Sequence, residues 1–142
     1  MTDLYQQMIV DHARRPRNFG PLDGANRTAE GVNPLCGDEL KVHLRLSDAI
    51  EAATFEGAGC AVCVASASMM TLAVTGLRAA DAARLMQCVR ELVAGGDGKN
   101  LGELESLKGV AQYPARRKCA LLAWRALEAA LAGELAKVST EL

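Results

Sequence analysis

Five cysteines are the residues of this chain best suited to chemistry, and they stand at positions 36, 60, 63, 88 and 119. Their number is odd and the first residues show no signal-peptide pattern, so a framework of disulfides is disfavoured. Unpaired cysteines commonly bind metals or react as thiolates. The sequence therefore predicts a metal centre or a thiol-based reaction.

The strongest local motif is the segment NPLCGD at 33–38, which precedes a predicted strand. Proline and glycine on either side of Cys36 are typical of a turn. Cys36 and Asp38 are two residues apart, so both side chains can point into one pocket. We take this turn as one part of a candidate site.

Two further cysteines lie near the predicted starts of helices. Cys60 follows the glycine-rich segment 57–59, and free N–H groups and the helix dipole at such a position favour a thiolate. Cys119 follows three consecutive cations at 116–118, which are expected to lower the pKa of its thiol. Both cysteines are therefore candidate ligands.

A set of three thiolates and one carboxylate would leave a formal charge of about −2 around a divalent ion. The cations at 116–118 can offset that charge. Such a set suits zinc, and it suits a small iron–sulfur cluster equally well. The spacing matches no compact zinc finger, so both metals stay open on the residues alone.

The other two cysteines have plainer interpretations. Cys88 shares a helical face with Leu85 and Leu92, which predicts a place in the core. Cys63 completes a Cys-x-x-Cys pair with Cys60, but no thioredoxin-like context supports a redox pair. Cys63 is therefore expected to line its helix or to lie beside the site as an auxiliary thiol.

The two histidines are interpreted as solvated residues. His43 falls on the polar face of a predicted strand, between Lys41 and Arg45. His12 falls near the end of the first helix, before an arginine cluster that is typical of a solvated face or a docking surface. Neither histidine is taken as a ligand.

Hydrophobic periodicity predicts strands first and helices afterwards, which favours an α+β fold with a small antiparallel sheet and helices on one face. The chain is expected to form a single domain over residues 1–142, with 134–142 as a frayed helix or flexible tail. The predicted helices are 2–14, about 60–75, 79–94 and 115–132, with a short one at 102–107; the predicted strands are 39–46, about 49–56 and one before Asn33.

Composition excludes several classes of function. The net charge is −1 and only five residues are aromatic, so neither an electrostatic nor a stacking surface for nucleic acid is expected. No continuous apolar run is long enough to span a membrane. We therefore expect no nucleic-acid partner, no membrane association and a cytoplasmic location.

Three separated segments are distinctive when taken together: NPLCGD at 33–38, GCA at 59–61 with ASASMMT at 65–71, and RKCALLAW at 117–124. Together they resemble the IscU/SufU (NifU N-terminal-like) family. The first helix and the loop up to Gly20 resemble the start of that family as well. The match runs in order over residues 3–132.

The resemblance implies that Cys36, Asp38, Cys60 and Cys119 converge on one surface site. It also implies work with a cysteine desulfurase, which supplies sulfur as a persulfide. One branch of the family is a scaffold for a [2Fe–2S] cluster. The other, SufU-type branch binds zinc at the same four residues and accepts sulfur from a SufS-type desulfurase.

Several features of this sequence are similar to the SufU-type branch. Lys118 stands where the scaffold branch has histidine, and segment 113–117 replaces the chaperone-binding Leu-Pro-Pro-Val-Lys motif. Segment 90–112 resembles an insertion of the SufU type, and Arg116 matches an arginine near the zinc. The family pattern has a small or hydroxyl side chain at position 63, and Cys63 departs from that pattern.

The resulting hypothesis is a zinc-dependent sulfur-transfer protein in which Cys36 accepts sulfur and Arg116 supports it. Downstream iron–sulfur scaffold or acceptor proteins would then receive the sulfur. The alternative is a scaffold that binds a nascent [2Fe–2S] cluster or iron on the same residues. A purely structural zinc is ranked last, because the donors stand on glycine-flanked turns and helix starts.

Overall fold

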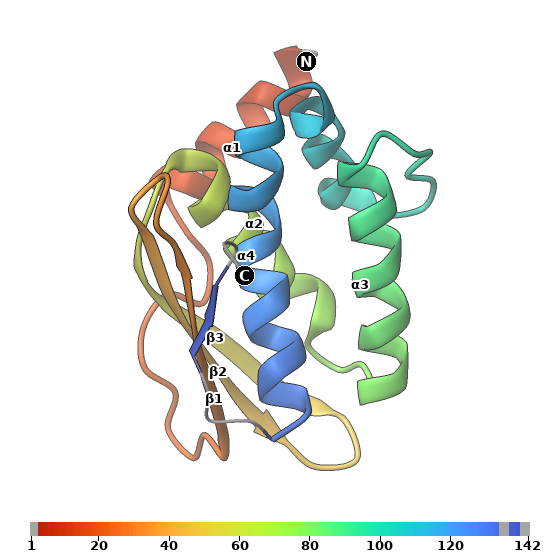
Figure 1. Ribbon diagram of the computed structural model, residues 1–142. Helices are drawn as coiled ribbons and strands as arrows, with labels where there is room; N and C mark the ends of the chain where they lie inside the picture. The colour runs from red at the N-terminus through yellow and green to blue at the C-terminus, as the bar shows by residue number, and fades with distance from the viewer. Residues whose placement is uncertain (1–2, 134–136, 140–142) are drawn as a thin grey trace.

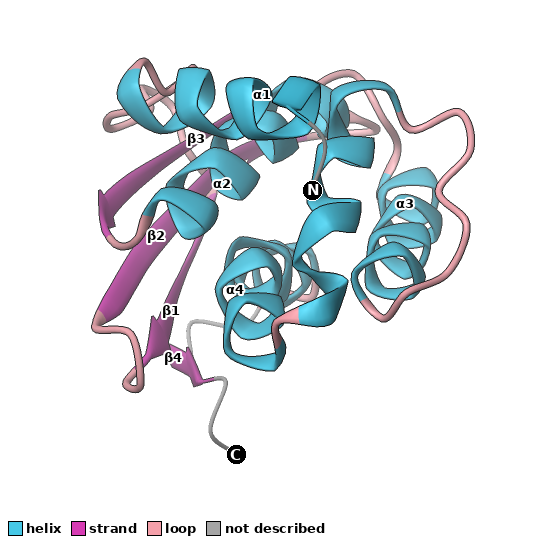
Figure 2. Ribbon diagram, turned by 90° about the horizontal axis from the view of Figure 1, so that it is seen from above, coloured by secondary structure: helices cyan, strands magenta, loops and turns pink. Residues whose placement is uncertain are grey.

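The computed structural model describes residues 3–133 and 137–139, which form one sheet covered by helices on one side (Figures 1 and 2). The element bounds are α1 Asp3–Arg14, β1 Arg27–Asn33, β2 Asp38–Leu46, β3 Ile50–Ala58, α2 Ala61–Val74, α3 Ala79–Val93, the 3-10 segment η1 Gly102–Gln112, α4 Pro114–Leu131 and β4 Lys137–Ser139. The predicted α+β fold with helices on one face is confirmed. None of the described helices is long and apolar enough to cross a membrane.

The sheet has the strand order β3-β2-β1-β4. The first three strands pair antiparallel through short turns, as the alternating pattern predicts. β4 instead pairs parallel to β1, so the sheet is mixed. The tail predicted at 134–142 is therefore wrong for Lys137–Ser139, while 134–136 and 140–142 lie outside the described residues.

Both edges of the sheet carry additional backbone hydrogen bonds. β4 covers the free side of β1. On the far edge, Phe55 of β3 donates its N–H to the Asn18 carbonyl at 3.1 Å and accepts the Gly20 N–H at 2.9 Å. The loop between α1 and β1 is thereby held along β3.

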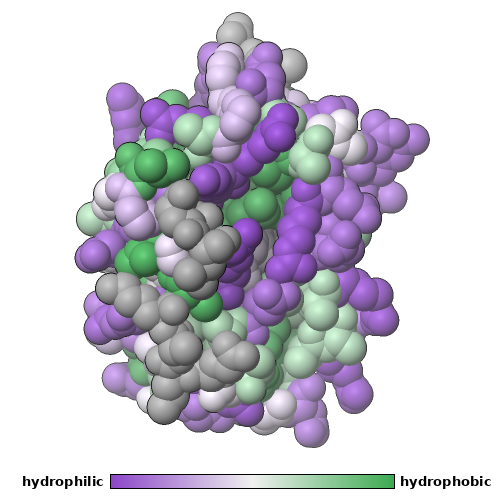
Figure 3. Space-filling view, in the orientation of Figure 1, coloured by the Kyte–Doolittle hydropathy of each residue, from purple (hydrophilic) through white to green (hydrophobic). Residues whose placement is uncertain are grey.

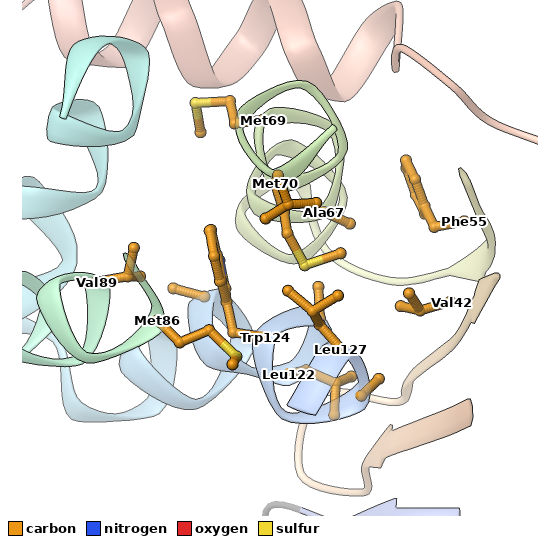
Figure 4. Close-up of a cluster of buried hydrophobic side chains, with 14 of the residues drawn as sticks. Val42, Phe55, Ala67, Met69, Met70, Met86, Val89, Leu122, Trp124 and Leu127 are labelled. Carbon is orange, nitrogen blue, oxygen red and sulfur yellow. The ribbon is translucent and has the colours of Figure 1, made fainter. Parts of the chain in front are cut away.

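The core lies between the sheet and helices α2 and α4 (Figure 4). α2 has hydrophobic or small residues on almost every face, because α1, α4, β3 and η1 surround it. Trp124 of α4 is 1% exposed and donates its indole N–H to Ser66 Oγ at 3.1 Å. Ser66 in turn donates to the Ala120 carbonyl at 2.6 Å, so this small polar residue of α2 serves the packing of α2 against α4.

Cys88 is exposed, which contradicts its predicted place in the core. The buried stripe of α3 is centred on Met86 and Val89 and extends to Val93. Cys88 lies beside that stripe and shares the outer surface of the helix with Gln87. Hydrophilic side chains make up most of the face of the molecule on the α3 side (Figure 3).

The prediction of solvated histidines is wrong for His12 and holds only in part for His43, which lies on the predicted polar face of its strand. His12 is fully buried, with Nδ1 2.7 Å from Ser68 Oγ and Nε2 2.6 Å from Glu103 Oε2. It therefore joins α1 to α2 and to η1. The local sequence around His12 does not reveal that these three elements pack together. His43 is half-buried on the outer face of the sheet, between Thr28 at 3.0 Å and Glu56 at 2.6 Å.

Leu122→Ala tests the packing of α4 on the sheet. Leu122 is fully buried, so its truncation should lower the free energy of unfolding by about 2–5 kcal/mol. Denaturant unfolding in the presence of a chelator measures this loss without a contribution from bound metal. Leu72→Ala is the matched control, because Leu72 is 49% exposed and should change stability by no more than about 0.5 kcal/mol. Equal losses for the two variants would contradict the described core.

Candidate metal centre

The β1–β2 turn and the first turns of α2 and α4 meet at one end of the sheet, in the upper part of Figure 1. Cys36 and Asp38 come from the turn and the start of β2, and Cys119 comes from α4. Each of these three residues offers one ligand atom, and the three atoms lie within 4.8 Å of one another. Cys119 Sγ also donates to Cys36 Sγ at 3.3 Å. Cys119 is distant in sequence from Cys36 and Asp38, but the fold brings the two thiols and the carboxylate together.

Cys60 adjoins this group from the start of α2. It is the N-cap residue, with extended backbone angles φ −68° and ψ 167°. Its backbone N–H donates to Asp38 Oδ1 at 2.9 Å, and its side chain interacts with Cys119. The thiol of Cys60 is not a member of the 4.8 Å group, but the residue is anchored directly beside it.

Asp38 is the most constrained donor of the site. It is 1% exposed, and its two oxygens accept hydrogen bonds from the Cys60 N–H and from Asn33 Nδ2. A buried carboxylate costs a large desolvation free energy unless donors or a cation compensate it. The two hydrogen bonds supply part of that compensation and fix the direction in which the carboxylate points.

Asn33 is a site residue whose role the sequence does not reveal. It is buried, and its amide donates to Asp38 Oδ2 at 3.2 Å and to Cys119 Sγ at 3.4 Å. Asparagine before proline is a common turn residue, so its position in the motif predicts only a turn. Its contact with α4 depends on tertiary packing.

The prediction that neighbouring cations lower the pKa of Cys119 is wrong. Burial raises the pKa of this thiol, and its contacts with Cys36, Asp38 and Cys60 raise it further. The exposed Arg116 does interact with Cys119, and the pKa of its guanidinium is raised by that contact and by Cys60. Arg117 is directed elsewhere and donates to the Ala111 carbonyl at 2.5 Å. Desolvation therefore outweighs the attraction between the Cys119 thiolate and Arg116.

The donor set fits a thiophilic metal ion. Thiols and one carboxylate from separate elements converge with partial or complete burial, and the carboxylate already accepts two hydrogen bonds. Zinc accepts such ligands in tetrahedral sites, and iron–sulfur clusters are held by similar thiolates. A guanidinium beside the site offsets part of the negative charge. Cys36, Asp38, Cys60 and Cys119 are the residues that would hold the ion.

Comparisons with known proteins agree with the fold and with these motifs. The family described as NifU-like N terminal domain matches residues 4–139. The zinc-dependent sulfurtransferase SufU of Bacillus subtilis is 42% identical over 92% of this chain and 91% of its own. The iron–sulfur cluster assembly scaffold protein IscU of Streptococcus pyogenes is 41% identical over 92% of this chain and 84% of its own.

A solved structure supports the same relationship. It is described as a candidate iron–sulfur cluster assembly scaffold protein for the SUF system from Fervidobacterium islandicum AW-1. Its TM-score is 0.83 and its identity 32%, over 88% of this chain and 94% of that chain.

The raised pKa of Cys119 predicts that zinc binding depends strongly on pH. A thiol whose pKa is raised stays protonated at neutral pH, so an ion must displace that proton to bind. Apparent zinc affinity should therefore rise by at least about tenfold per pH unit between pH 6 and 8, one factor of ten for each proton released. Competition with a zinc-sensitive dye measures the apparent zinc affinity at each pH. Cys88→Ser should leave the slope unchanged, and an affinity independent of pH would contradict thiol ligation.

Proposed function

Because this chain belongs to the NifU-like N-terminal domain family, which includes IscU and SufU proteins, we propose that it is a zinc-dependent sulfur acceptor in iron–sulfur cluster assembly. The observation that carries the proposal is the grouping of Cys36, Asp38 and Cys119 within 4.8 Å. Zinc bound by these residues and Cys60 would keep the thiols deprotonated at neutral pH. The sulfur donor in this proposal is a SufS-type cysteine desulfurase in the cytoplasm.

Cys36 is the thiol best placed to accept sulfur. It is half-buried on the turn between β1 and β2, whereas Cys119 is fully buried. Gly37, next to it, has a φ of +70°, a backbone conformation that glycine adopts without strain. Cys60 is also half-buried, but it is the N-cap of α2 and its backbone is bonded to Asp38. A partner can therefore reach Cys36 without disrupting a helix.

The transfer is a thiol exchange at the outer sulfur of a persulfide on the desulfurase. The Cys36 thiolate attacks that sulfur and a new S–S bond forms on Cys36. The S–S bond of the donor breaks, and the desulfurase cysteine leaves as a thiolate with the electron pair. Arg116, exposed and in contact with Cys119, offers a positive charge beside these anions.

Exposed apolar side chains beside the site favour contact with a partner protein. Leu35, adjacent to Cys36, is 68% exposed, and Tyr113, the N-cap of α4, is 52% exposed. Tyrosine is enriched in protein–protein interfaces, and Leu35 adds apolar area next to the accepting thiol. In this proposal both side chains contact the desulfurase and later a downstream scaffold or acceptor protein.

The second candidate function is a scaffold for a [2Fe–2S] cluster. The relative from Streptococcus pyogenes, which carries that description, is almost as similar to this chain as the Bacillus sulfurtransferase. Cysteine thiolates hold clusters of this kind as well as zinc. Anaerobic addition of iron and sulfide would produce a brown protein with visible absorption if this second function holds.

Sulfide release by the desulfurase of the same organism, measured with a reductant, tests the sulfur-acceptor function. The zinc-loaded protein should raise the rate at least about tenfold, and Cys36→Ser should abolish the rise because no thiol remains at the accepting position. Cys88→Ser is the matched control and should behave as the unaltered protein, since Cys88 is exposed on α3 away from the turn. Normal stimulation by Cys36→Ser would refute Cys36 as acceptor, and no stimulation together with cluster formation would favour the scaffold.

A further inference from the structure

Cys63 is a fourth thiol that lies beside the four candidate ligands. It occupies the third position of α2 and is 0% exposed. Among the described residues it has no hydrogen-bond partner. A buried cysteine of this kind can be an inert packing residue. Its position relative to Asp38 and Cys60 argues for more than packing.

The start of α2 directs Cys63 toward the metal centre. Side chains on a helix tilt toward its N-terminus, and the side chain at the third position reaches back toward the N-cap residue. The N-cap residue here is Cys60. Cys60 and Cys63 therefore present their thiols to the same end of the helix, where Asp38 accepts the Cys60 N–H.

Gly59 shows how close Cys63 comes to Asp38. A Cβ atom at position 59 would lie 2.7 Å from Asp38 Oδ1 and 3.0 Å from Cys63 Sγ. The first distance is shorter than real Cβ contacts and the second is tighter than most of them, so a side chain at position 59 would have to displace one or both groups. The carboxylate oxygen and the thiol sulfur consequently border the same small space.

The two groups that share this space differ in chemical character. The carboxylate of Asp38 is a hard ligand, and the sulfur of Cys63 is a soft one. Soft ions such as Cd²⁺ prefer a complete set of thiolates to a mixed set. The site thus contains one more donor than a four-coordinate ion needs, and the hard Asp38 and the soft Cys63 are alternatives for one position.

We propose that Cys63 is an alternative ligand that replaces Asp38 and converts the site into a four-thiolate centre for soft metal ions. The four ligands are then Cys36, Cys60, Cys63 and Cys119. In the absence of a soft ion, Asp38 occupies the fourth ligand position and Cys63 packs as a neutral thiol. The inference rests on the metal centre described above, and it adds a ligand and a class of ion to it.

Cadmium bound to the full chain under a thiol-free phosphine reductant, which prevents disulfides, tests the proposal. X-ray absorption at the cadmium edge counts sulfur neighbours, and competition titration measures affinity. The unaltered protein and Asp38→Asn should both show four sulfurs, whereas Cys63→Ala should show three sulfurs and an oxygen. Asparagine keeps an oxygen that accepts the Cys60 N–H but loses the acceptor for Asn33 Nδ2, so the fold of this variant is checked separately.

The double variant Asp38→Asn with Cys63→Ala provides the decisive comparison. Asp38→Asn alone should lose less than about tenfold in cadmium affinity, and the double variant at least about a hundredfold. Cys88→Ala removes an exposed thiol and should change neither the count of sulfur neighbours nor the cadmium affinity. Circular dichroism checks that each variant is folded.

Two results would overturn the inference in distinguishable ways. Equal affinities of Asp38→Asn and the double variant, together with loss of binding in Cys119→Ser, would refute Cys63 as a ligand and leave the metal centre intact. Full cadmium affinity and an unchanged sulfur count in Cys119→Ser would refute the metal centre itself, and the role of Cys63 with it.

Discussion

The hydrogen bond from the Cys60 backbone N–H to Asp38 Oδ1 is the contact on which the site depends. It joins the start of β2 to the start of α2, two points that the chain connects only through the β2–β3 hairpin. Because the Asp38 carboxylate is buried, the bond is worth more than one to an exposed carboxylate. It satisfies one of the free N–H groups at the helix start and orients the carboxylate at the same time. Asn33 completes the arrangement by bonding Asp38 and Cys119 together.

Much of the candidate site could be predicted from the sequence because its donors lie in motifs with local causes. Proline and glycine around Cys36 form a turn, and the glycines before Cys60 lead into a helix start; the structure shows both. The pKa of Cys119 could not be predicted, since burial is a property of the folded chain. Asn33 was missed for the same reason: a turn residue reveals nothing about the helix that packs over it.

The fold shows the same division between local and long-range information. Alternation and helical periodicity locate β2 and the helices within a few residues of their observed bounds. His12 was misassigned because its partners, Ser68 and Glu103, are distant in sequence. Cys88 was misassigned because it lies next to the buried stripe of α3, and only the packed neighbours decide where that stripe ends. β4 has three residues, too few for a periodic signal.

The covered edges of the sheet have a consequence for a protein that must expose reactive groups. An uncovered strand offers unpaired N–H and C=O groups to any other chain and promotes aggregation. Here β4 lies along β1, and the backbone of Asn18 and Gly20 lies along part of β3. β4 is itself the outer strand on one side, but its three residues offer few backbone groups to another chain, and on the other side Phe55 of β3 is already bonded. Self-association by strand addition is thereby disfavoured, because very short edge strands and occupied backbone groups give an incoming strand little to pair with.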